Sequence, residues 1–277
     1  SIFNGEIYNH KELRDKLILC GYKFYSMNDT EVIANAYHYW GEKFLQKLKG
    51  QFALAVYDKE KSNFILARDE HGISPLYYSK IGDKLYFSST PDSIFMQSNK
   101  KLLLNEQAVS DFIVADCIPN GNTFYKNIKY IEPGNYFLIN YKKKIFKKRN
   151  FFSYKKYNKI KKGTHDKKYY IEKIYEILAN GVEKRFEGDK NVGVFLSSGL
   201  DSSLVLGLIR QIYPKKKINT FTASFRNSTS KDLIGEHKNS EKIANYFNAE
   251  NTIVPIEPKQ LLKSIGTFSQ PSAGMIE

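Results

Sequence analysis

The sequence predicts an α/β protein with an antiparallel-sheet domain flanked by helices, followed by a parallel-sheet domain. Residues 1–99 contain two hairpin patterns, in which short apolar strands are separated by turn residues such as Gly82-Asp83. From about residue 166 the pattern changes to helix, strand, helix, strand, helix and strand. That alternation is typical of a parallel sheet with crossover helices.

Short strands and helices alternate through the first domain. In order, the residues predict a strand through Ile2-Phe3 that runs into a turn by Asn9, helices over 11–20 and 31–40, and hairpins over 51–68 and 76–88. Gly21 and Gly41 are placed to end the two helices, because glycine readily adopts the left-handed conformation that often follows a last helical turn. Asp29 or Thr30 can cap the second helix.

A middle section over about 100–165 contains Pro-Gly turn signals and ends in a lysine-rich stretch. We therefore expect three parts: a first domain over 1–99, a connector over 100–165, and a second domain over 166–277. The elements expected in the second domain are helices over 169–185, 202–213 and 237–247 and strands over 192–196, 218–224 and 251–255. Ser1 leads directly into a strand and the last residues fall in an unfinished α/β pattern, so both natural ends are expected outside the sequence.

Composition limits the functions to consider. The 277 residues carry a formal net charge of +14 at pH 7, which invites a nucleic-acid partner. Much of the excess lies in Lys-Lys runs between Lys142 and Lys168 without a recognised binding motif, so we interpret it as a solvated linker and expect no nucleic-acid partner. No apolar run is long enough to span a bilayer and no secretory leader is visible. Cys20 and Cys117 have neither disulfide nor metal spacing, so we expect packing roles in a reduced, cytoplasmic setting.

The segment from Gly193 to Ser203 is the most informative feature of the sequence. An apolar strand runs into a loop of small residues, Ser197-Ser198-Gly199, and the loop opens a helix. Small residues let the backbone approach a ligand, and the amides at a helix start are a ready seat for phosphate at the carboxyl edge of the sheet. The spacing is not that of the Walker P-loop, and no lysine follows. An ordinary turn between a buried strand and a buried helix is the alternative.

Asn4-Gly5-Glu6 and Asp29 form a second candidate site. An Asn side-chain amide beside a Gly backbone amide is a donor pair suited to an oxyanion. A carboxylate such as that of Asp29 can bind an ammonium group. The alternatives are a hairpin turn at Asn4-Gly5 and a plain helix cap at Asp29.

Five ordered motifs resemble a known family. They are Phe3-Asn4-Gly5-Glu6-Ile7-Tyr8-Asn9, Asn28-Asp29-Thr30-Glu31-Val32-Ile33, residues 50–58, residues 67–78, and Ile131-Glu132-Pro133-Gly134. The pattern is similar to the class II, N-terminal-nucleophile glutamine amidotransferase domain of glutamine-dependent asparagine synthetases. The later loop resembles the pyrophosphate loop of the ATP-pyrophosphatase families. This resemblance covers nearly the whole chain and implies an antiparallel N-terminal-nucleophile sandwich followed by a parallel-sheet ATP-pyrophosphatase domain.

The resemblance also implies roles for particular residues. Asn4 and Gly5 would supply the oxyanion hole for glutamine hydrolysis. The residues implied to hold glutamine are Asn4, Gly5, Glu6 and Asp29. The residues implied to bind or border ATP are Leu196, Ser197, Ser198, Gly199, Leu200, Asp201, Ser202, Ser203 and Ala223, and metal ligands stay unassigned.

The implied reaction is a ligation. Ammonia from glutamine attacks an aspartyl-adenylate and gives asparagine, AMP and pyrophosphate, with Mg²⁺ accompanying ATP. The implied partners are glutamine, ATP and aspartate, or another carboxylate acceptor. No membrane partner is expected, and a homodimer is one option for the assembly.

Three departures from the family pattern bear on the expected activity. The family's nucleophilic Cys and its glutamine-binding Arg fall upstream of residue 1. Residues 1–277 alone are therefore not expected to hydrolyse glutamine. Ser198 stands where the family usually has a second Gly, which is expected to alter the loop geometry while keeping binding. Gln270-Pro271-Ser272-Ala273-Gly274 stands where relatives often have Glu-Pro-Phe-Ala-Asp, near the acceptor. The identity of the acceptor is therefore left open.

Other functions stay open besides asparagine synthesis. The same chemistry can amidate another carboxylate, such as a sugar acid of a surface polysaccharide. A non-catalytic relative can sense glutamine or a nucleotide, or form an interaction surface. A nucleic-acid-binding module is the least favoured alternative.

Overall fold

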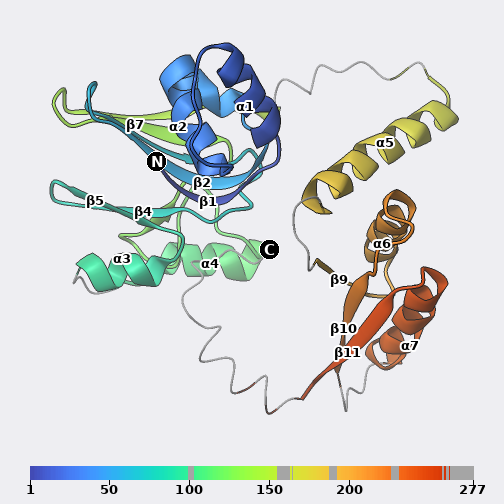
Figure 1. Cartoon of the computed structure of the whole chain (residues 1–277). Coiled ribbons are helices and arrows are strands. Elements are labelled where there is room, and N and C mark those ends of the chain that lie inside the picture. Colours follow the sequence, from blue (N-terminus) through green and yellow to red (C-terminus); the bar gives the residue numbers. More distant parts are fainter. Residues whose placement is uncertain are drawn as a thin grey trace. The chain divides into compact units, whose positions relative to one another are not determined.

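The computed structural model of the chain describes residues 1–98, 103–154, 163, 165–186, 192–225, 231–257, 259 and 262. They belong to two units, one containing Ser1–Ile160 and the other Lys161–Ser269 (Figure 1). The first unit is built on antiparallel sheets and the second on a parallel sheet. The predicted fold class is thereby confirmed.

Two antiparallel sheets form the centre of the first unit. The larger has the order β1-β2-β3-β7-β8, with bounds Ile2–Ile7, Gly50–Asp58, Asn63–Arg68, Asn135–Asn140 and Ile145–Asn150. The smaller has the order β5-β4-β6, with bounds Lys84–Ser88, Tyr77–Ile81 and Lys129–Tyr130. The stretch set apart by the sequence as a connector thus contributes β7 and β8 to the larger sheet.

Five helical segments accompany these sheets. They are α1 (His10–Leu19), α2 (Asp29–Trp40), the 3₁₀ helix η1 (Gly41–Gln46), α3 (Pro91–Ser98) and α4 (Glu106–Ala115). The two helices predicted after the first strand are confirmed, and each begins one or two residues earlier than expected. Gly21 and Gly41, which follow them, have φ angles of +88° and +58°.

The first unit is a four-layer sandwich of helices, sheet, sheet and helix. Along β2 the side chains alternate: Phe52 and Leu54 pack with the α1 and α2 core, whereas Ala53 and Ala55 pack against the smaller sheet. The outer face of the smaller sheet packs on α3 through Ile94. Figure 1 shows these layers in that order, from α1 and α2 to α3.

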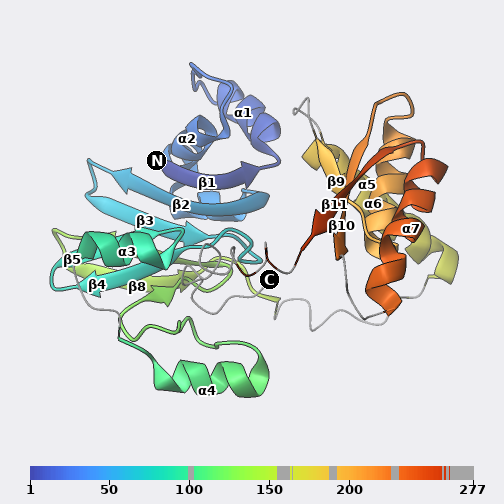
Figure 2. The same ribbon diagram turned by 90° about the horizontal axis from the view of Figure 1, so that it is seen from below.

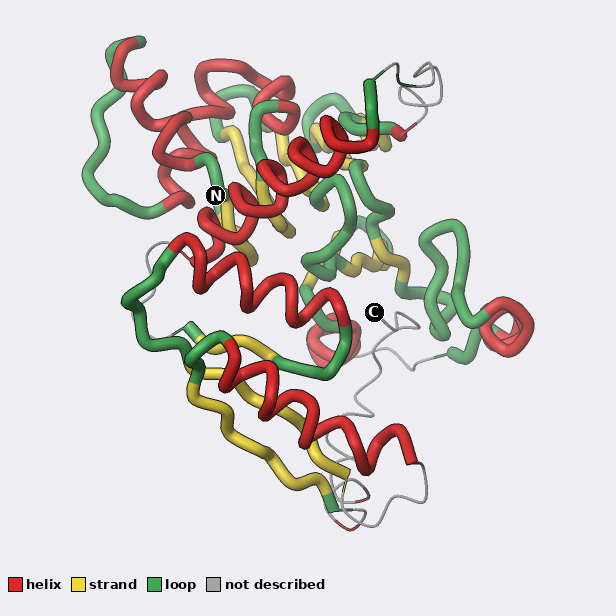
Figure 3. Tube along the Cα trace, turned by 90° about the vertical axis from the view of Figure 1, so that its right-hand side faces the viewer, coloured by secondary structure: helices red, strands yellow, loops and turns green. Residues whose placement is uncertain are grey.

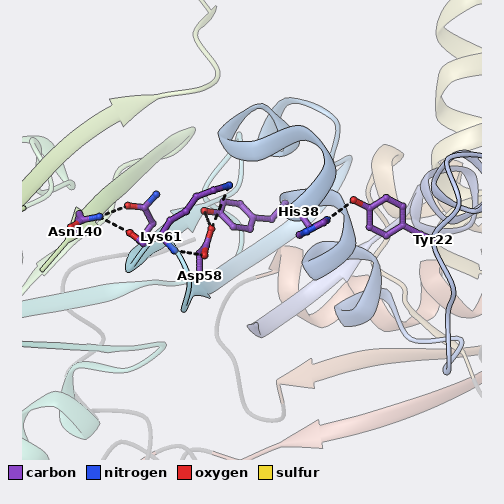
Figure 4. A network of polar contacts seen from close by, with 7 residues as sticks. Tyr22, His38, Asp58, Lys61 and Asn140 are labelled. Atoms are coloured by element: carbon purple, nitrogen blue, oxygen red, sulfur yellow. Dashed lines mark hydrogen bonds and ion pairs between the residues drawn. The ribbon is translucent and has the colours of Figure 1, made fainter. Parts of the chain in front are cut away.

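A polar network fastens α2 to the hairpin of β2 and β3. The Tyr37 hydroxyl donates to Asp58 Oδ2 at 3.0 Å, and Asp58 Oδ1 accepts from the Lys61 backbone N–H at 2.9 Å. Asn140 of β7 then donates to the Lys61 carbonyl at 2.9 Å and to Asn63 Oδ1 at 2.7 Å (Figure 4). Burial, together with the bond to Asp58, raises the pKa of Tyr37 to about 12.

The second unit contains a three-stranded parallel sheet of order β11-β10-β9. Its strands and helices are α5 (Lys167–Phe186), β9 (Gly193–Phe195), α6 (Leu200–Ile212), β10 (Asn219–Phe225), α7 (Lys231–Tyr246) and β11 (Glu250–Ile256). The alternation of helix and strand predicted from the sequence is confirmed, and Figure 3 shows it with helices and strands in separate colours. Val194, Leu206 and Ala244 share one core cluster, so α6 and α7 cover the same face of the sheet (Figure 2).

Candidate active sites

The first candidate site lies at the edge of the larger sheet, on β1. Asn4, Gly5 and Glu6 pair in register with Ala53, Phe52 and Gln51 of β2. Asn4-Gly5 is therefore part of a strand, and the alternative of a hairpin turn at this position is wrong.

Strands β1 and β2 approach too closely at Gly5 for any side chain. Gly5 has a φ angle of +135°, and a Cβ placed on it would lie 2.0 Å from the Gln51 carbonyl oxygen. The same restriction applies to Gly50 on the other strand, because a Cβ placed on it would lie 2.1 Å from the Glu6 carbonyl oxygen. Glycine is therefore required at both positions, Gly5 of β1 and Gly50 of β2, because the paired strands approach closely there.

The backbone N–H of Gly5 faces the open edge of β1. Its partner Phe52 donates its own N–H to Asp69 Oδ2 and accepts from the Asp69 N–H, on the side away from β1. Ile7, two residues after Gly5, donates its N–H to Asp29 Oδ2 at 3.3 Å. Backbone groups alternate along an antiparallel strand, so the Gly5 and Ile7 amides lie on the same edge. The structure thus brings Gly5 and Asp29 to one side of β1.

Asp29 is the first residue of α2 and its carboxylate faces β1. The cap position is taken by Asn28, whose backbone is extended and whose side chain makes no capping bond. The alternative of Asp29 as the helix cap is therefore wrong. Asp29 is half-buried, and its contact with the Ile7 N–H leaves the carboxylate beside the open edge of β1.

The loop before Asp29 is fastened by two side chains that the sequence analysis did not single out. Arg14 of α1 is buried and donates to the Ser26 carbonyl and, at 3.1 Å, to the Asn28 carbonyl. Glu31 accepts from the Tyr25 and Ser26 N–H groups at 2.9 and 2.8 Å. Arg14 lies on the buried stripe of α1, beside Leu13 and Leu17, and a charged residue on an apolar stripe is a signal that could have identified it.

These contacts give the loop a pH dependence. The bond from the Tyr25 backbone, followed by that from the Ser26 hydroxyl, lowers the pKa of Glu31 below its ordinary value of 4.5. Because the pKa of Glu31 is lower in the folded protein than in the unfolded chain, the ionised carboxylate stabilises the fold at pH values above the ordinary pKa. This stabilisation is lost as the pH falls through the folded-state pKa. We expect Glu31→Gln to lower the urea midpoint of the first unit at pH 7, and the difference from wild type to shrink toward pH 3.

Fluorescence of Trp40, the single tryptophan of the 277 residues, measures this effect in the 277-residue chain because Trp40 packs against the core of the first unit. Glu60→Gln, at an exposed position of the β2–β3 turn, is the matched control and should show no such convergence. A Glu31→Gln difference that stays constant from pH 7 to pH 3 would contradict the assigned contacts.

The Asn4 side chain reaches the smaller sheet. Its Nδ2 donates to Ser89 Oγ at 2.9 Å, across 85 residues of sequence. Ser89 directly follows β5 and was not among the residues expected at the site. No local sequence signal identifies it, because the contact exists only when the two sheets are stacked.

A buried pair of residues supports β2 from behind. Arg68 is 1% exposed and donates to the carbonyl oxygens of Ser74, Ile131 and Gly72. Asp69 is fully buried, and its carboxylate accepts four backbone N–H groups, those of Phe52, His71, Ile73 and Ser74, at 3.0 to 3.2 Å. Phe52 is the residue opposite Gly5, so this pair helps to fix the strand on which the site rests.

The second candidate site is the loop between β9 and α6. Ser197 and Ser202 hydroxyl oxygens lie 2.9 Å apart, and Ser202 Oγ accepts the Ser197 N–H at 3.2 Å. Ser197 Oγ accepts the Gly199 N–H at 3.1 Å, and the Ser203 hydroxyl donates to the Gly199 carbonyl at 2.7 Å. The serine side chains thus bond the loop to itself and to the first turn of α6.

The start of α6 is open to solvent. Ser198, Gly199, Leu200 and Asp201 are exposed, and the first amides of a helix have no acceptor within the helix. Serine hydroxyl groups and the amides of the first helical turn therefore lie around one exposed turn. Such a turn can receive an anion.

Leu196 and Ala223 occupy different positions at this edge. Leu196 is 3% exposed within the core, and its N–H donates to the Phe221 carbonyl at 2.9 Å. Ala223 is exposed on β10. Thr222, which the sequence analysis did not single out, donates to the Leu196 carbonyl at 2.8 Å and so ties the end of β9 to β10.

The structure also bears on the two cysteines, residues 270–274, membrane-spanning helices and metal sites. Cys20 and Cys117 are both exposed, so the packing role expected for them is wrong; each lies at the end of a helix rather than on its buried side. Residues 270–274 lie outside the described residues. Within the described part of the chain, no helix has the length and apolar character needed to cross a membrane, and no three His, Cys, Asp or Glu side chains gather as a metal site.

Comparison with known proteins defines first the class and then the family. A model of the glutamine amidotransferase domain matches residues 1–152, and a model of asparagine synthase matches residues 173–270. The chain is thus an amidotransferase domain joined to synthase sequence. It belongs to the family of glutamine-hydrolysing asparagine synthetases.

Two curated relatives agree with this assignment. Asparagine synthetase (glutamine-hydrolysing) 1 of Bacillus subtilis is 31% identical over 276 residues, which cover 98% of this chain and 42% of the relative. A putative asparagine synthetase 2 of Methanocaldococcus jannaschii is 33% identical over 226 residues, covering 81% and 42%. The chain therefore spans about two fifths of the length of these relatives. A solved glutamine phosphoribosylpyrophosphate amidotransferase of B. subtilis is 16% identical with a TM-score of 0.39, covering 99% of this chain and 74% of that one.

Proposed function

We propose that the full-length protein carrying this chain is a glutamine-dependent, ATP-consuming ligase of the cytoplasm that makes asparagine. Water and glutamine give glutamate and ammonia; ATP and aspartate give aspartyl-adenylate and pyrophosphate. Ammonia then attacks the adenylated carboxyl, forming the new C–N bond and releasing AMP. The observation that carries the proposal is the juxtaposition of Gly5 and Asp29 on the open edge of β1 in a chain of this family.

Each residue of the first site has a role in glutamine hydrolysis. The Asn4 side-chain amide and the Gly5 N–H stabilise the oxyanion that forms on the glutamine side-chain carbonyl. Asp29 receives the glutamine ammonium group, and Glu6, the residue of β1 after Gly5, contributes to holding glutamine. A strand edge with a required glycine suits this task, because no side chain stands between the backbone donor and the substrate.

The second site binds the phosphates of ATP. Residues 197–203 form the exposed turn at the start of α6 and provide serine hydroxyls and amides; Leu196 directly follows β9, and Ala223 lies on β10. Mg²⁺ would come with ATP, since it keeps most of its ligands as phosphate oxygens and waters, and Asp201 is the acidic residue of the first helical turn. When bound, the ion neutralises charge on the departing pyrophosphate.

ATP–pyrophosphate exchange by the full-length protein, with acceptors added one at a time, tests this function. We expect exchange that requires aspartate and is lost in Asp201→Ala, while glutamine hydrolysis in that variant remains measurable. Exchange only with a sugar acid would replace asparagine synthesis by amidation of that acid. No exchange with any acceptor would overturn the proposal in favour of a non-catalytic relative.

A further inference from the structure

The contact between Asn4 and Ser89 joins the two sheets at the first site. Asn4 lies on the edge strand of the larger sheet, and Ser89 directly follows β5, the edge strand of the smaller one. Asn4 Nδ2 donates to Ser89 Oγ at 2.9 Å, within the normal range for such a bond. The residue implied to act on the substrate is therefore held by a residue of the opposite layer.

Ser89 is itself held in place by its neighbours. The Thr90 N–H donates to Ser88 Oγ at 3.2 Å, and the Thr90 and Ser93 hydroxyls lie 2.9 Å apart where α3 begins. Ser89 is half-buried, whereas Asn4 is exposed. The Ser89 hydroxyl thus lies in a hydrogen-bonded turn and contacts the exposed Asn4 side chain.

The chemistry of the amide gives this contact a consequence. The last torsion of an Asn side chain is broad, so an exposed amide without a partner samples many orientations. An Asn amide has two N–H groups. Ser89 Oγ accepts one of them, which fixes the plane of the amide and leaves the other N–H in a defined direction. Electrostatic stabilisation of an oxyanion depends on such a donor being oriented before the reaction begins.

We propose that Ser89 is a positioning residue for glutamine hydrolysis, which orients the Asn4 amide as an oxyanion donor. The inference rests on the proposed function of Asn4. Ser89 touches neither substrate nor reacting atoms, so its removal should raise the barrier by disordering Asn4 rather than by weakening glutamine binding.

The test compares variants of the full-length protein in two assays, glutamine-dependent and ammonia-dependent asparagine synthesis. We expect Ser89→Ala to lower kcat with glutamine about 10-fold with little change in KM, a smaller loss than removal of the donor causes, because the Asn4 amide is disordered rather than deleted. Asn4→Ala should lower it on the order of 10²-fold. Ser89→Thr keeps the hydroxyl and should recover most of the loss. Ammonia-dependent synthesis should be unchanged in Ser89→Ala.

Two further variants separate positioning from a general structural role. Ser88→Ala removes the neighbouring hydroxyl, which bonds the same turn but not Asn4, and should leave kcat with glutamine near wild type. In an Asn4→Ala background, Ser89→Ala should cause no additional loss. Equal losses in Ser88→Ala and Ser89→Ala, or a full Ser89→Ala effect without Asn4, would overturn the inference. Absence of ammonia-dependent synthesis in the wild type would instead overturn the proposed function.

Discussion

Replacement of Asp69 by Ala is expected to lower the free energy of unfolding of the first unit by about 4 kcal/mol or more. The Asp69 carboxylate is fully buried and accepts four backbone N–H groups. Each buried donor left without a partner costs about 1 to 3 kcal/mol, although such losses do not add fully within one network. The strand β2 and the loop over 69–74 would lose their common anchor, since the carboxylate joins Phe52 of β2 to backbone N–H groups of that loop.

Urea unfolding of the 277-residue chain, followed by Trp40 fluorescence, measures this loss, because Trp40 is the single tryptophan of these residues and packs in the first unit. Asp83→Ala makes the same chemical change in the exposed turn between β4 and β5, and its effect should stay within about 0.5 kcal/mol. Asp69→Asn, which keeps one carbonyl acceptor, should lie between the two. An Asp69→Ala midpoint as high as that of Asp83→Ala would refute the anchoring role.

The elements of the fold follow from local sequence patterns. The hairpin of β2 and β3 was predicted within a residue at each end because its strands are runs of apolar residues bounded by polar turns. The parallel sheet was predicted because strand and helix alternate. The place of β7 and β8 was not predicted, since it depends on pairing between β3 and a strand about 70 residues later. No local pattern encodes that pairing.

At the first candidate site, too, some residues could be identified from the sequence, whereas others depend on contacts between distant parts of the chain. Gly5 and Asp29 were identified by resemblance, and the structure places both on one edge of β1 through the bond from Ile7 to Asp29. Ser89 was missed because its contact with Asn4 requires two stacked sheets. Asp69 was noted only as part of a motif, and its four bonds to backbone groups appear once the chain is folded. Cysteine is often buried, yet Cys20 is exposed, so the residue type alone does not predict burial.

The second large effect is expected from Gly5→Ala, which should abolish glutamine-dependent synthesis while leaving ammonia-dependent synthesis measurable. A φ angle of +135° is accessible to glycine alone in practice, and the new Cβ would lie 2.0 Å from the Gln51 carbonyl oxygen and 2.9 Å from the Phe52 Cα. Neither obstacle is a flexible side chain that can move aside. The strand β1 must therefore separate from β2 or change its path.

A displaced β1 would move both oxyanion donors, because Asn4 and Gly5 are on the strand itself. A shift of about 1 Å is enough to lose about 10² in rate, so we expect kcat with glutamine to fall by at least this factor. Activity with glutamine and with ammonia, measured in parallel, separates this effect from general unfolding, which would abolish both. Gly82→Ala is the matched control: Gly82 also has a positive φ, +58°, yet nothing lies within 4 Å of its Cβ position.

The comparison between the two glycines tests what Gly5 is for. If positive φ alone mattered, Gly82→Ala and Gly5→Ala would lower the urea midpoint by similar amounts and neither would affect glutamine use selectively. If close approach of β1 to β2 is the requirement, only Gly5→Ala loses glutamine-dependent synthesis, and Gly50→Ala, whose Cβ would meet the Glu6 carbonyl oxygen at 2.1 Å, should lose it as well. Full glutamine-dependent activity in Gly50→Ala would show that the contact between the strands is not what positions the donors.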